Sequence, residues 1–221
     1  CEGDDFWIAA DKLQFQVGIL NQHQSINLVV HNAYIANEKV ERSNRTFNKK
    51  YFNNKVTQVN KVFIVDGQFS PTASYFFRNT GLQFLNKFSG SPVGDFLIEV
   101  FLGIDGIYCS SKIMSVYRLN SEGSWSVNIL KSQEKRAVLY EKMMETLNLL
   151  QELLPHKKKS LVNSKKKTVY YRLAIVYISK NKVKSFSLFI KSIDVRNVKV
   201  KRFFSYFYFI FQYYYSVFRK A

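Results

Sequence analysis

The sequence predicts an α/β domain over residues 1–130, a helical extension over residues 131–197 and a basic, aromatic segment over residues 198–221. In the first part, short apolar runs typical of strands alternate with stretches that have helical spacing. From Ser132 to Leu154 the pattern becomes that of one long amphipathic helix. The charge divides near the same place. Residues 1–130 carry 12 Lys and Arg against 11 Asp and Glu, and the remaining residues carry 21 against 5.

Composition narrows the class of protein. A chain of 221 residues with 47% hydrophobic residues can bury a core, which excludes a disordered protein. Its net charge of +17 indicates an anionic partner for the C-terminal part. Cys1 and Cys109 are too few for a disulfide framework and lack metal-ligand spacing, so reduced thiols in the cytosol are expected. The acidic start has no secretory leader pattern.

An acidic turn opens the chain with the residues Cys-Glu-Gly-Asp-Asp-Phe-Trp. Asp4 and Asp5 follow a glycine that allows close backbone approach, and two aromatic residues follow them. Carboxylate oxygens suit Mg²⁺ or Mn²⁺, which proteins commonly hold through one or two carboxylates plus substrate phosphates. The alternative is a solvated turn or a helix N-cap.

The next elements follow from spacing. Asp11 can cap a helix whose apolar positions are Leu13, Val17 and Leu20. Residues 28–30 then predict a short buried strand. The polar residues 40–60 predict a mobile surface loop, and residues 62–65 and 75–77 predict further strands. Ser70, Thr72 and Ser74 can either hydrogen-bond a ligand or satisfy a turn.

A second group of elements brings further candidate residues. Residues 97–102 predict a buried helix closed by Gly103, with Asp95 in its first turn, where the helix dipole favours a carboxylate. Residues 107–109 and 114–117 predict two short strands. Arg118 follows at once, where a guanidinium can pair with a diphosphate.

The extension is predicted to be helical. The helix 132–154 is expected to end at Pro155 and the lysines after it, and residues 170–178 and 183–193 predict a helical hairpin. Residues 203–218 are nearly all aromatic or aliphatic and are flanked by Lys and Arg. A helix of that length rises about 24 Å, so it should lie in a membrane interface more readily than span one. Core packing is the second possibility, and nucleic-acid stacking is the third.

Several motifs occur in an order that resembles one family. These are the acidic turn, Asp11-Lys12-Leu13-Gln14 with Gln16-Val17, His31-Asn32, Ser70-Pro71-Thr72-Ala73-Ser74 with Phe77-Arg78, Gly94-Asp95-Phe96, and Met114-Ser115-Val116-Tyr117-Arg118 with Gly123 and Trp125-Ser126. The chain resembles bacterial family 2 glycosyltransferases over about its first 130 residues. The resemblance implies a GT-A (Rossmann-like) domain that lacks its N-terminal nucleotide-binding strands, which would lie roughly a hundred residues earlier.

The resemblance also implies site residues and a function. Asp4 and Asp5 would hold Mg²⁺ or Mn²⁺, and Asp95 would be the catalytic base. Arg118 and Asn120 would bind the donor diphosphate, although Asn120 stands where the family commonly has histidine. The resemblance assigns Thr72, Ser74 and Trp125 to the acceptor pocket. The implied reaction is inverting transfer of a sugar from a nucleotide-diphosphate donor to a saccharide or lipid-linked acceptor in surface polysaccharide biosynthesis.

This reading places the protein in the cytoplasm, peripheral to the inner face of the cell membrane, with an anionic membrane surface as partner and no nucleic acid. Two alternatives remain open. The chain can be a non-catalytic fragment that acts as a membrane-associated binding module, or a basic nucleic-acid-binding module.

Overall fold

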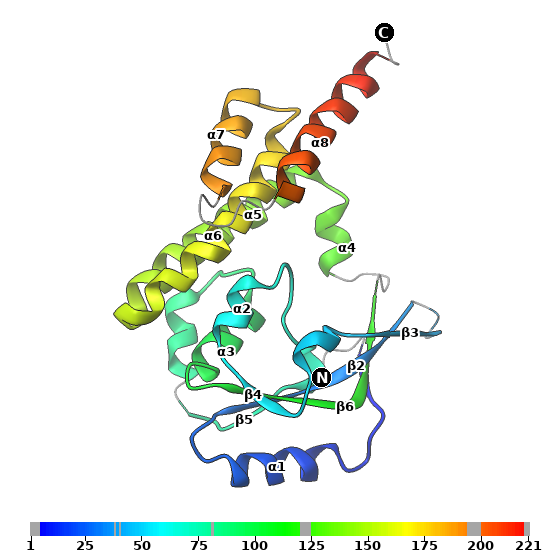
Figure 1. The fold of residues 1–221 in the computed structure, drawn as a ribbon, viewed down its shortest axis with the longest axis vertical. Helices are drawn as coiled ribbons and strands as arrows, with labels where there is room; N and C mark the ends of the chain where they lie inside the picture. Colours follow the sequence, from blue (N-terminus) through cyan, green and yellow to red (C-terminus); the bar gives the residue numbers. More distant parts are fainter. Residues whose placement is uncertain are drawn as a thin grey trace. The chain divides into compact units, whose positions relative to one another are not determined.

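The structure is a computed structural model that describes residues 5–37, 39, 41–80, 82–119, 125–193 and 200–218. It divides into two compact units, Cys1–Asn128 (unit 1) and Ile129–Ala221 (unit 2). Within the described residues, unit 1 combines helices with a mixed sheet, and unit 2 is helical (Figure 1). The predicted mixed α/β class is therefore confirmed.

Unit 1 is built on a sheet of six strands within its described part. In order along the chain, its elements are β1 (Phe6–Trp7), α1 (Lys12–Gln22), β2 (Leu28–Ala36), β3 (Arg42–Thr46), η1 (Lys49–Tyr51), β4 (Lys55–Thr57), α2 (Asn60–Ile64), η2 (Thr72–Ser74), β5 (Phe76–Phe77), η3 (Leu82–Phe88), α3 (Gly94–Leu102), β6 (Ile107–Arg118) and α4 (Trp125–Leu130), which ends in unit 2. The sheet order is β1-β6-β2-β3, with β4 also paired to β6 and β5 to β2. Only the β2 and β6 pair is parallel among these ladders.

The long strand β2 contains the predicted strand 28–30. Leu28, Val29 and Val30 are fully buried, as expected for a strand covered on both faces. The strand continues through His31 and Asn32 to Ala36, and its parallel register with β6 shifts on both sides of Asn32. The predicted strand is thus confirmed but longer, since its partner β6 supplies ladder hydrogen bonds beyond the apolar run.

The polar stretch 40–60 is not the surface loop that its composition predicts. It contains β3, which pairs with β2, and β4, which pairs with β6. Charged and polar side chains are tolerated at sheet edges, and the ladder partner decides whether such a stretch becomes a strand. The prediction was wrong because the polar composition shows neither partner, although β2 directly precedes the stretch and only β6 lies far away in the sequence.

Two other local predictions were wrong. Residues 62–65, expected as a strand, lie largely in α2, where Val62 and Phe63 are buried and the Phe63 ring meets Phe96 edge-on at 5.5 Å. A four-residue apolar run fits a buried helical turn as well as a strand. The two strands expected at 107–109 and 114–117 form the single strand β6. Its polar middle is held by Asn54, whose Oδ1 accepts a hydrogen bond from the Ser111 backbone N at 2.8 Å.

Unit 2 contains the predicted long helix and a hairpin whose second helix matches the prediction, whereas its first helix begins at His156 and not at residue 170. Its remaining helices are α5 (Gln133–Leu153), α6 (His156–Tyr177), α7 (Lys182–Ser192) and α8 (Val200–Phe218). Ser132 caps α5 by accepting a hydrogen bond from the Lys135 backbone N. The lysines after Pro155 were predicted to end the preceding helix, but they lie in the first turn of α6. Proline lacks an N–H, so it stops α5 and is tolerated at the start of the next helix.

The last helix packs against α7 through aromatic side chains. The rings of Phe189 and Tyr206 stack with centroids 4.0 Å apart, and Tyr206 is 1% exposed. The prediction of a helix over 203–218 is confirmed, with a start three residues earlier. Among the described residues, no helix is both long and apolar enough to cross a membrane.

Candidate functional site

The segment from Ser70 to Tyr75 is the point of unit 1 where candidate residues from distant parts of the chain meet. Pro71 precedes the single turn η2, and its carbonyl oxygen accepts hydrogen bonds from the backbone N and the hydroxyl of Ser74 at 2.9 and 2.6 Å. Ser70 and Ser74 are fully buried. This short segment is therefore fixed by its own hydrogen bonds, and three groups of side chains attach to it.

The first group joins the acidic turn to the end of β6. The Trp7 indole donates to the Ala73 carbonyl oxygen at 2.9 Å, which ties β1 to η2. Two residues earlier, Asp5 is buried, and its Oδ1 accepts a hydrogen bond from the backbone N of Arg118 at 3.0 Å. Residues 113 positions apart, predicted to bind metal and diphosphate, are therefore adjacent. Asp4 and Asn120 lie outside the described residues.

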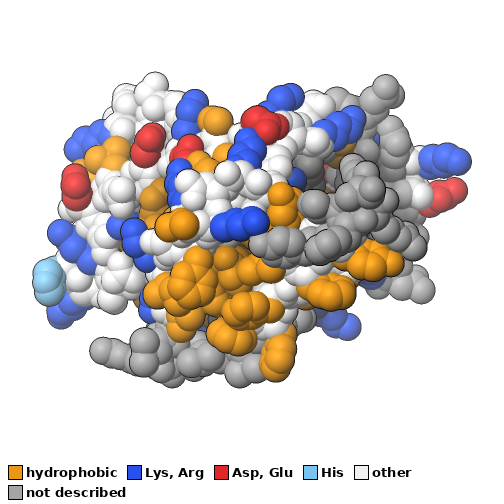
Figure 2. Space-filling view, turned by 90° about the horizontal axis from the view of Figure 1, so that it is seen from above, with side chains coloured by type: hydrophobic (Ala, Val, Ile, Leu, Met, Phe, Trp, Pro, Cys, Tyr) orange, Lys and Arg blue, Asp and Glu red, His pale blue; other side chains and the backbone are white. Residues whose placement is uncertain are grey.

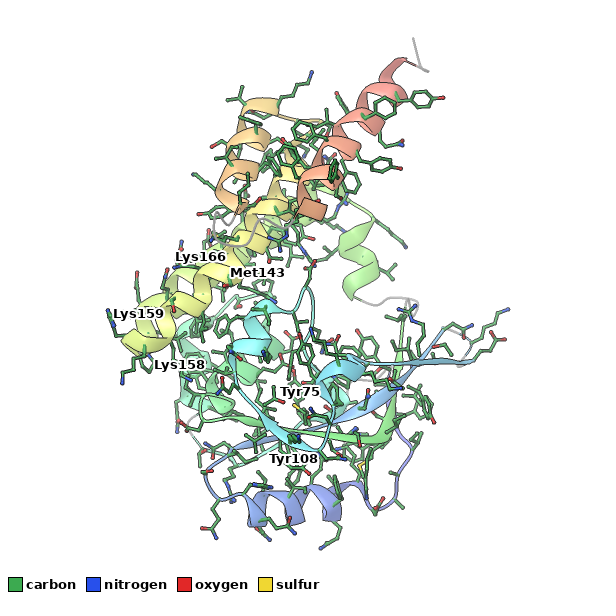
Figure 3. All side chains as sticks on the ribbon, viewed as in Figure 1. Tyr75, Tyr108, Met143, Lys158, Lys159 and Lys166 are labelled. Carbon is green, nitrogen blue, oxygen red and sulfur yellow. The ribbon has the colours of Figure 1, made fainter. Side chains whose placement is uncertain are left out.

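The second group is a buried carboxyl cluster on α3. Oε1 of Glu99 accepts hydrogen bonds from the Ser70 backbone N at 2.9 Å, the Ser70 hydroxyl at 2.5 Å and the Tyr75 hydroxyl at 2.8 Å (Tyr75 is labelled in Figure 3). Burial raises the pKa of Glu99 to about 7, although these hydrogen bonds oppose the change. Burial, and then the charge of Glu99, raises the pKa of the Tyr75 hydroxyl.

Asp95 lies one helical turn before Glu99, in the first turn of α3. It is half-buried, and its Oδ1 accepts a hydrogen bond from the Phe96 backbone N at 2.8 Å. Asp95 and Glu99 are four residues apart on α3, so their carboxyl groups lie on one side of the helix. The negative charge of Asp95 contributes to the raised pKa values of both Glu99 and Tyr75. The structure thus brings the predicted base to the Ser70–Tyr75 segment.

The third group comes from α1. Gln16 donates from Nε2 to the Ser74 carbonyl oxygen at 2.8 Å and to that of Val29 at 3.3 Å. Its Oε1 accepts from Lys12 Nζ at 2.8 Å, and that ammonium lies 4.1 Å from the centre of the Trp7 ring. Lys12 is 1% exposed, and burial lowers its pKa to about 8.

His31, which the sequence left outside the catalytic residues, is fully buried in β2. Its Nδ1 lies 2.8 Å from the Asn32 carbonyl oxygen. Burial lowers the pKa of its imidazole to about 4, and the charge of Lys12 acts in the same direction. The side chain is therefore neutral at pH 7.

The predicted acceptor residues have different surroundings. Thr72 is half-buried in η2, whereas the buried Ser74 hydroxyl donates to Pro71. Trp125 begins α4, and its side chain lies outside the described part of the structure.

The residues that suit a divalent ion are few. In the described part of the chain, no group of three or more His, Cys, Asp and Glu side chains gathers in a way that could hold a metal. A site made of one or two carboxylates plus substrate phosphates does not need such a group. Of the two carboxylates predicted to bind metal, Asp5 lies within the described residues, where its Oδ1 accepts the Arg118 backbone N–H.

The sequence did not identify Glu99, Tyr75, Lys12 or Gln16 as site residues. A signal was present for Glu99, because it is the one charged residue in the apolar run 97–102 and stands four positions after Asp95. Lys12 and Gln16 also differ by four positions, which places them on one face of α1. That spacing does not show that this face of α1 is buried, so the sequence alone could not identify Lys12 and Gln16 as interior residues.

Comparisons of the chain with protein-family models, with curated proteins and with solved structures found no match.

Proposed function

We propose that this chain carries the metal, diphosphate and acceptor side of an inverting glycosyltransferase site, in the manner of a family 2 glycosyltransferase with a GT-A domain. The observation that supports this most strongly is the contact between Asp5 Oδ1 and the Arg118 backbone. It joins the two ends of the chain segment that the resemblance covers, and it joins residues for which the resemblance implies complementary roles.

On the donor side, Asp5 together with Asp4 would hold Mg²⁺ or Mn²⁺, and Arg118 and Asn120 would bind the diphosphate. The ion offsets negative charge that develops on the leaving nucleotide diphosphate. Arg118 is the last residue of β6, so its backbone is fixed by the ladder and by Asp5. A guanidinium anchored in this way can form two parallel hydrogen bonds to phosphate oxygens.

On the acceptor side, Asp95 would take the proton of the acceptor hydroxyl as that oxygen attacks the anomeric carbon. The bond from that carbon to the diphosphate breaks on the opposite face, which inverts the configuration. A general base must be ionised before it acts. Asp95 is half-buried and lies one helical turn before the buried Glu99, whose pKa burial raises to about 7.

The acceptor is proposed to be a saccharide or lipid-linked sugar that binds in the region of Thr72, Ser74 and Trp125. Its proposed setting is surface polysaccharide assembly at the cytoplasmic face of the membrane. The buried Ser74 hydroxyl already donates to Pro71, so Ser74 would act on the acceptor by holding the shape of η2. Thr72, which is half-buried on the same turn, would make the direct contact.

Thermal unfolding with nucleotide diphosphates tests the donor side. We expect UDP or GDP to raise the melting temperature of the chain only when Mn²⁺ or Mg²⁺ is present, because a ligand that binds the folded state stabilises it. Asp5→Asn should abolish this increment. The matched control is Asp105→Asn, which changes an exposed aspartate outside the cluster. If no nucleotide diphosphate gives a metal-dependent increment, this chain has no donor site of its own and the non-catalytic alternative is favoured.

Transfer assays with a labelled donor sugar test the base. Asp95→Asn should keep the metal-dependent nucleotide increment and lose transfer by about a hundredfold or more, the usual contribution of a positioned general base. Normal turnover in this variant would show that another group takes the proton, and Glu99→Gln would then be the next variant to assay.

A further inference from the structure

The outward face of α8 carries a stripe of exposed aromatic residues. Phe204, Tyr208, Phe211 and Tyr215, the α8 outer stripe, are between 48% and 71% exposed. Their spacings of four, three and four residues place them on one side of the helix. The side chains that face the rest of unit 2 are Tyr206, Ile210 and Tyr213, which lie on the opposite side.

Packing within unit 2 accounts for only one of these two faces. Tyr206 stacks on Phe189, and its hydroxyl lies 2.8 Å from the Ser185 Oγ. Since Ser185 donates its own hydrogen to the Ala174 carbonyl oxygen at 2.7 Å, Tyr206 donates to Ser185. The hydroxyl of this buried tyrosine is therefore satisfied. None of these contacts involves the α8 outer stripe.

The neighbouring helix α7 has the same arrangement. Val183, Phe186 and Ile190, the α7 outer stripe, are more than half exposed, while Ser185, Phe189 and Ser192 on the other side are buried. An open hollow of about 210 Å³ lies between α7 and α8, with Phe186 and Ile210 among its mostly apolar walls. Figure 2 shows hydrophobic side chains gathered in one broad patch, with Lys and Arg side chains around it.

The charge beside this apolar surface is almost entirely positive. Residues 180–220 contain ten Lys and Arg and one acidic residue, Asp194. Lys182 and Lys191 of α7 are exposed. The partner must therefore offer both an apolar interior and a negative surface. A second copy of the chain would bring two positive faces together, which like-charge repulsion disfavours.

Two anionic partners remain, and the side-chain types favour one of them. Single-stranded nucleic acid binds by stacking bases on aromatic rings, but Val183 and Ile190 offer no ring. A bilayer interface accepts aliphatic and aromatic side chains alike, places Tyr and Phe rings at the headgroups and attracts flanking lysines to anionic lipid. The 19 residues of α8 give a length of about 28 Å, enough for a helix that lies in that interface.

We propose that the outer stripes of α7 and α8 dock this chain on an anionic lipid bilayer, with α8 in the interface and the hollow between the helices open to a lipid acyl chain. This surface belongs to unit 2 and requires neither a nucleotide nor a sugar. Its test is therefore independent of the proposed transfer reaction.

Co-sedimentation with vesicles tests the proposal. The full chain should bind vesicles of phosphatidylcholine mixed with phosphatidylserine, and bind pure phosphatidylcholine more weakly, with the difference decreasing as salt rises. Phe204→Ser with Phe211→Ser should weaken binding about tenfold or more, because each ring loses its burial in the lipid. The matched control is Leu13→Ser with Val17→Ser, which removes two exposed apolar side chains from α1 in unit 1.

A second variant keeps the test informative if the serine substitutions disturb folding. Phe211→Trp retains an interfacial side chain, so it should bind vesicles as the parent does and shift its fluorescence to shorter wavelength when vesicles are added. Equal loss of binding in the α8 double variant and the α1 control would overturn the proposal. So would binding to a single-stranded oligonucleotide without binding to anionic vesicles.

Discussion

Unit 1 buries polar and charged side chains that most proteins leave in water, whereas unit 2 exposes aromatic side chains that most proteins bury. In unit 1, Lys12, Gln16 and Glu99 are inaccessible to solvent or nearly so, and each is hydrogen-bonded. In unit 2, Phe204 and Phe211 are 71% and 64% exposed. Both arrangements have a cost, and both mark surfaces or sites where function is expected.

The difference lies in how each unit offsets its cost. A buried polar group needs specific partners, and the buried Gln16 and Glu99 both find them on one short segment, Ser70 to Tyr75. An exposed apolar side chain needs no hydrogen-bond partner in the folded protein. The outer stripes of unit 2 are therefore compatible with a stable fold, provided that the opposite faces of the same helices carry the packing.

The largest expected effect separates the two faces of α8. Tyr206→Ala should destabilise unit 2 by about 3–5 kcal/mol, because it removes a buried ring stacked on Phe189 and leaves a cavity. Phe204→Ala should change stability by less than about 0.5 kcal/mol, since the side chain is mostly exposed. Hydrogen exchange of the α7 and α8 amides measures both. Similar losses in the two variants would mean that the outer stripe also packs within the protein.

The next effect concerns the polar interior of unit 1. Gln16→Leu should cost about 1–3 kcal/mol, because the carbonyl oxygens of Ser74 and Val29 lose a donor and Lys12 loses its acceptor. Gln14→Leu on the exposed side of α1 is the matched control and should be nearly neutral. Denaturant unfolding of the two variants measures the difference. If Gln16→Leu matches its control, these hydrogen bonds do not stabilise unit 1.

An effect of similar size that depends on pH should come from Glu99. Its folded-state pKa of about 7 lies above its ordinary value of 4.5, so the folded state binds the proton more tightly than the unfolded state. Stability from this group is fully present below about pH 4.5 and is lost as the pH rises to about 7, by about 3 kcal/mol at most. Glu99→Gln should flatten this part of the stability profile. A parallel profile in the variant would assign the dependence to another group.

Local pattern was sufficient for the long helices. The helix with the Ser132 cap and the aromatic run 203–218 were predictable because repeated spacing and capping act within a few residues of each other. The helix that carries Asp95 was predictable for the same reason, and its C-terminal residue precedes the expected Gly103.

Long-range pairing decided the rest. The strand β4 exists because β6, far later in the chain, offers it a ladder, and nothing in the polar sequence 40–60 shows that partner. The strand β3 instead pairs with β2, the strand that precedes it. In α1 the apolar residues Leu13 and Val17 are exposed, while Lys12 and Gln16 face inward toward backbone carbonyls and the Trp7 ring. The resemblance implied separate roles for Asp5 and Arg118 but not their contact, and no local rule joins residues so far apart in the chain.

The smallest effects are expected from an exposed ion pair and a helix N-cap in unit 2. The hydrogen bond from Lys180, 2.6 Å from the Glu134 carboxylate, is the largest cause that lowers the pKa of Glu134 to about 2. The stabilisation from this pair is therefore present above about pH 4.5 and is lost as the pH falls toward 2. Because the carboxylate is exposed, water and salt screen the pair, and Glu134→Gln should leave the melting temperature at pH 7 unchanged.

Ser132→Ala, which removes the adjacent N-cap, should cost about 1 kcal/mol. A larger loss in Glu134→Gln than in Ser132→Ala would mean that exposed charge stabilises unit 2 more than helix capping does.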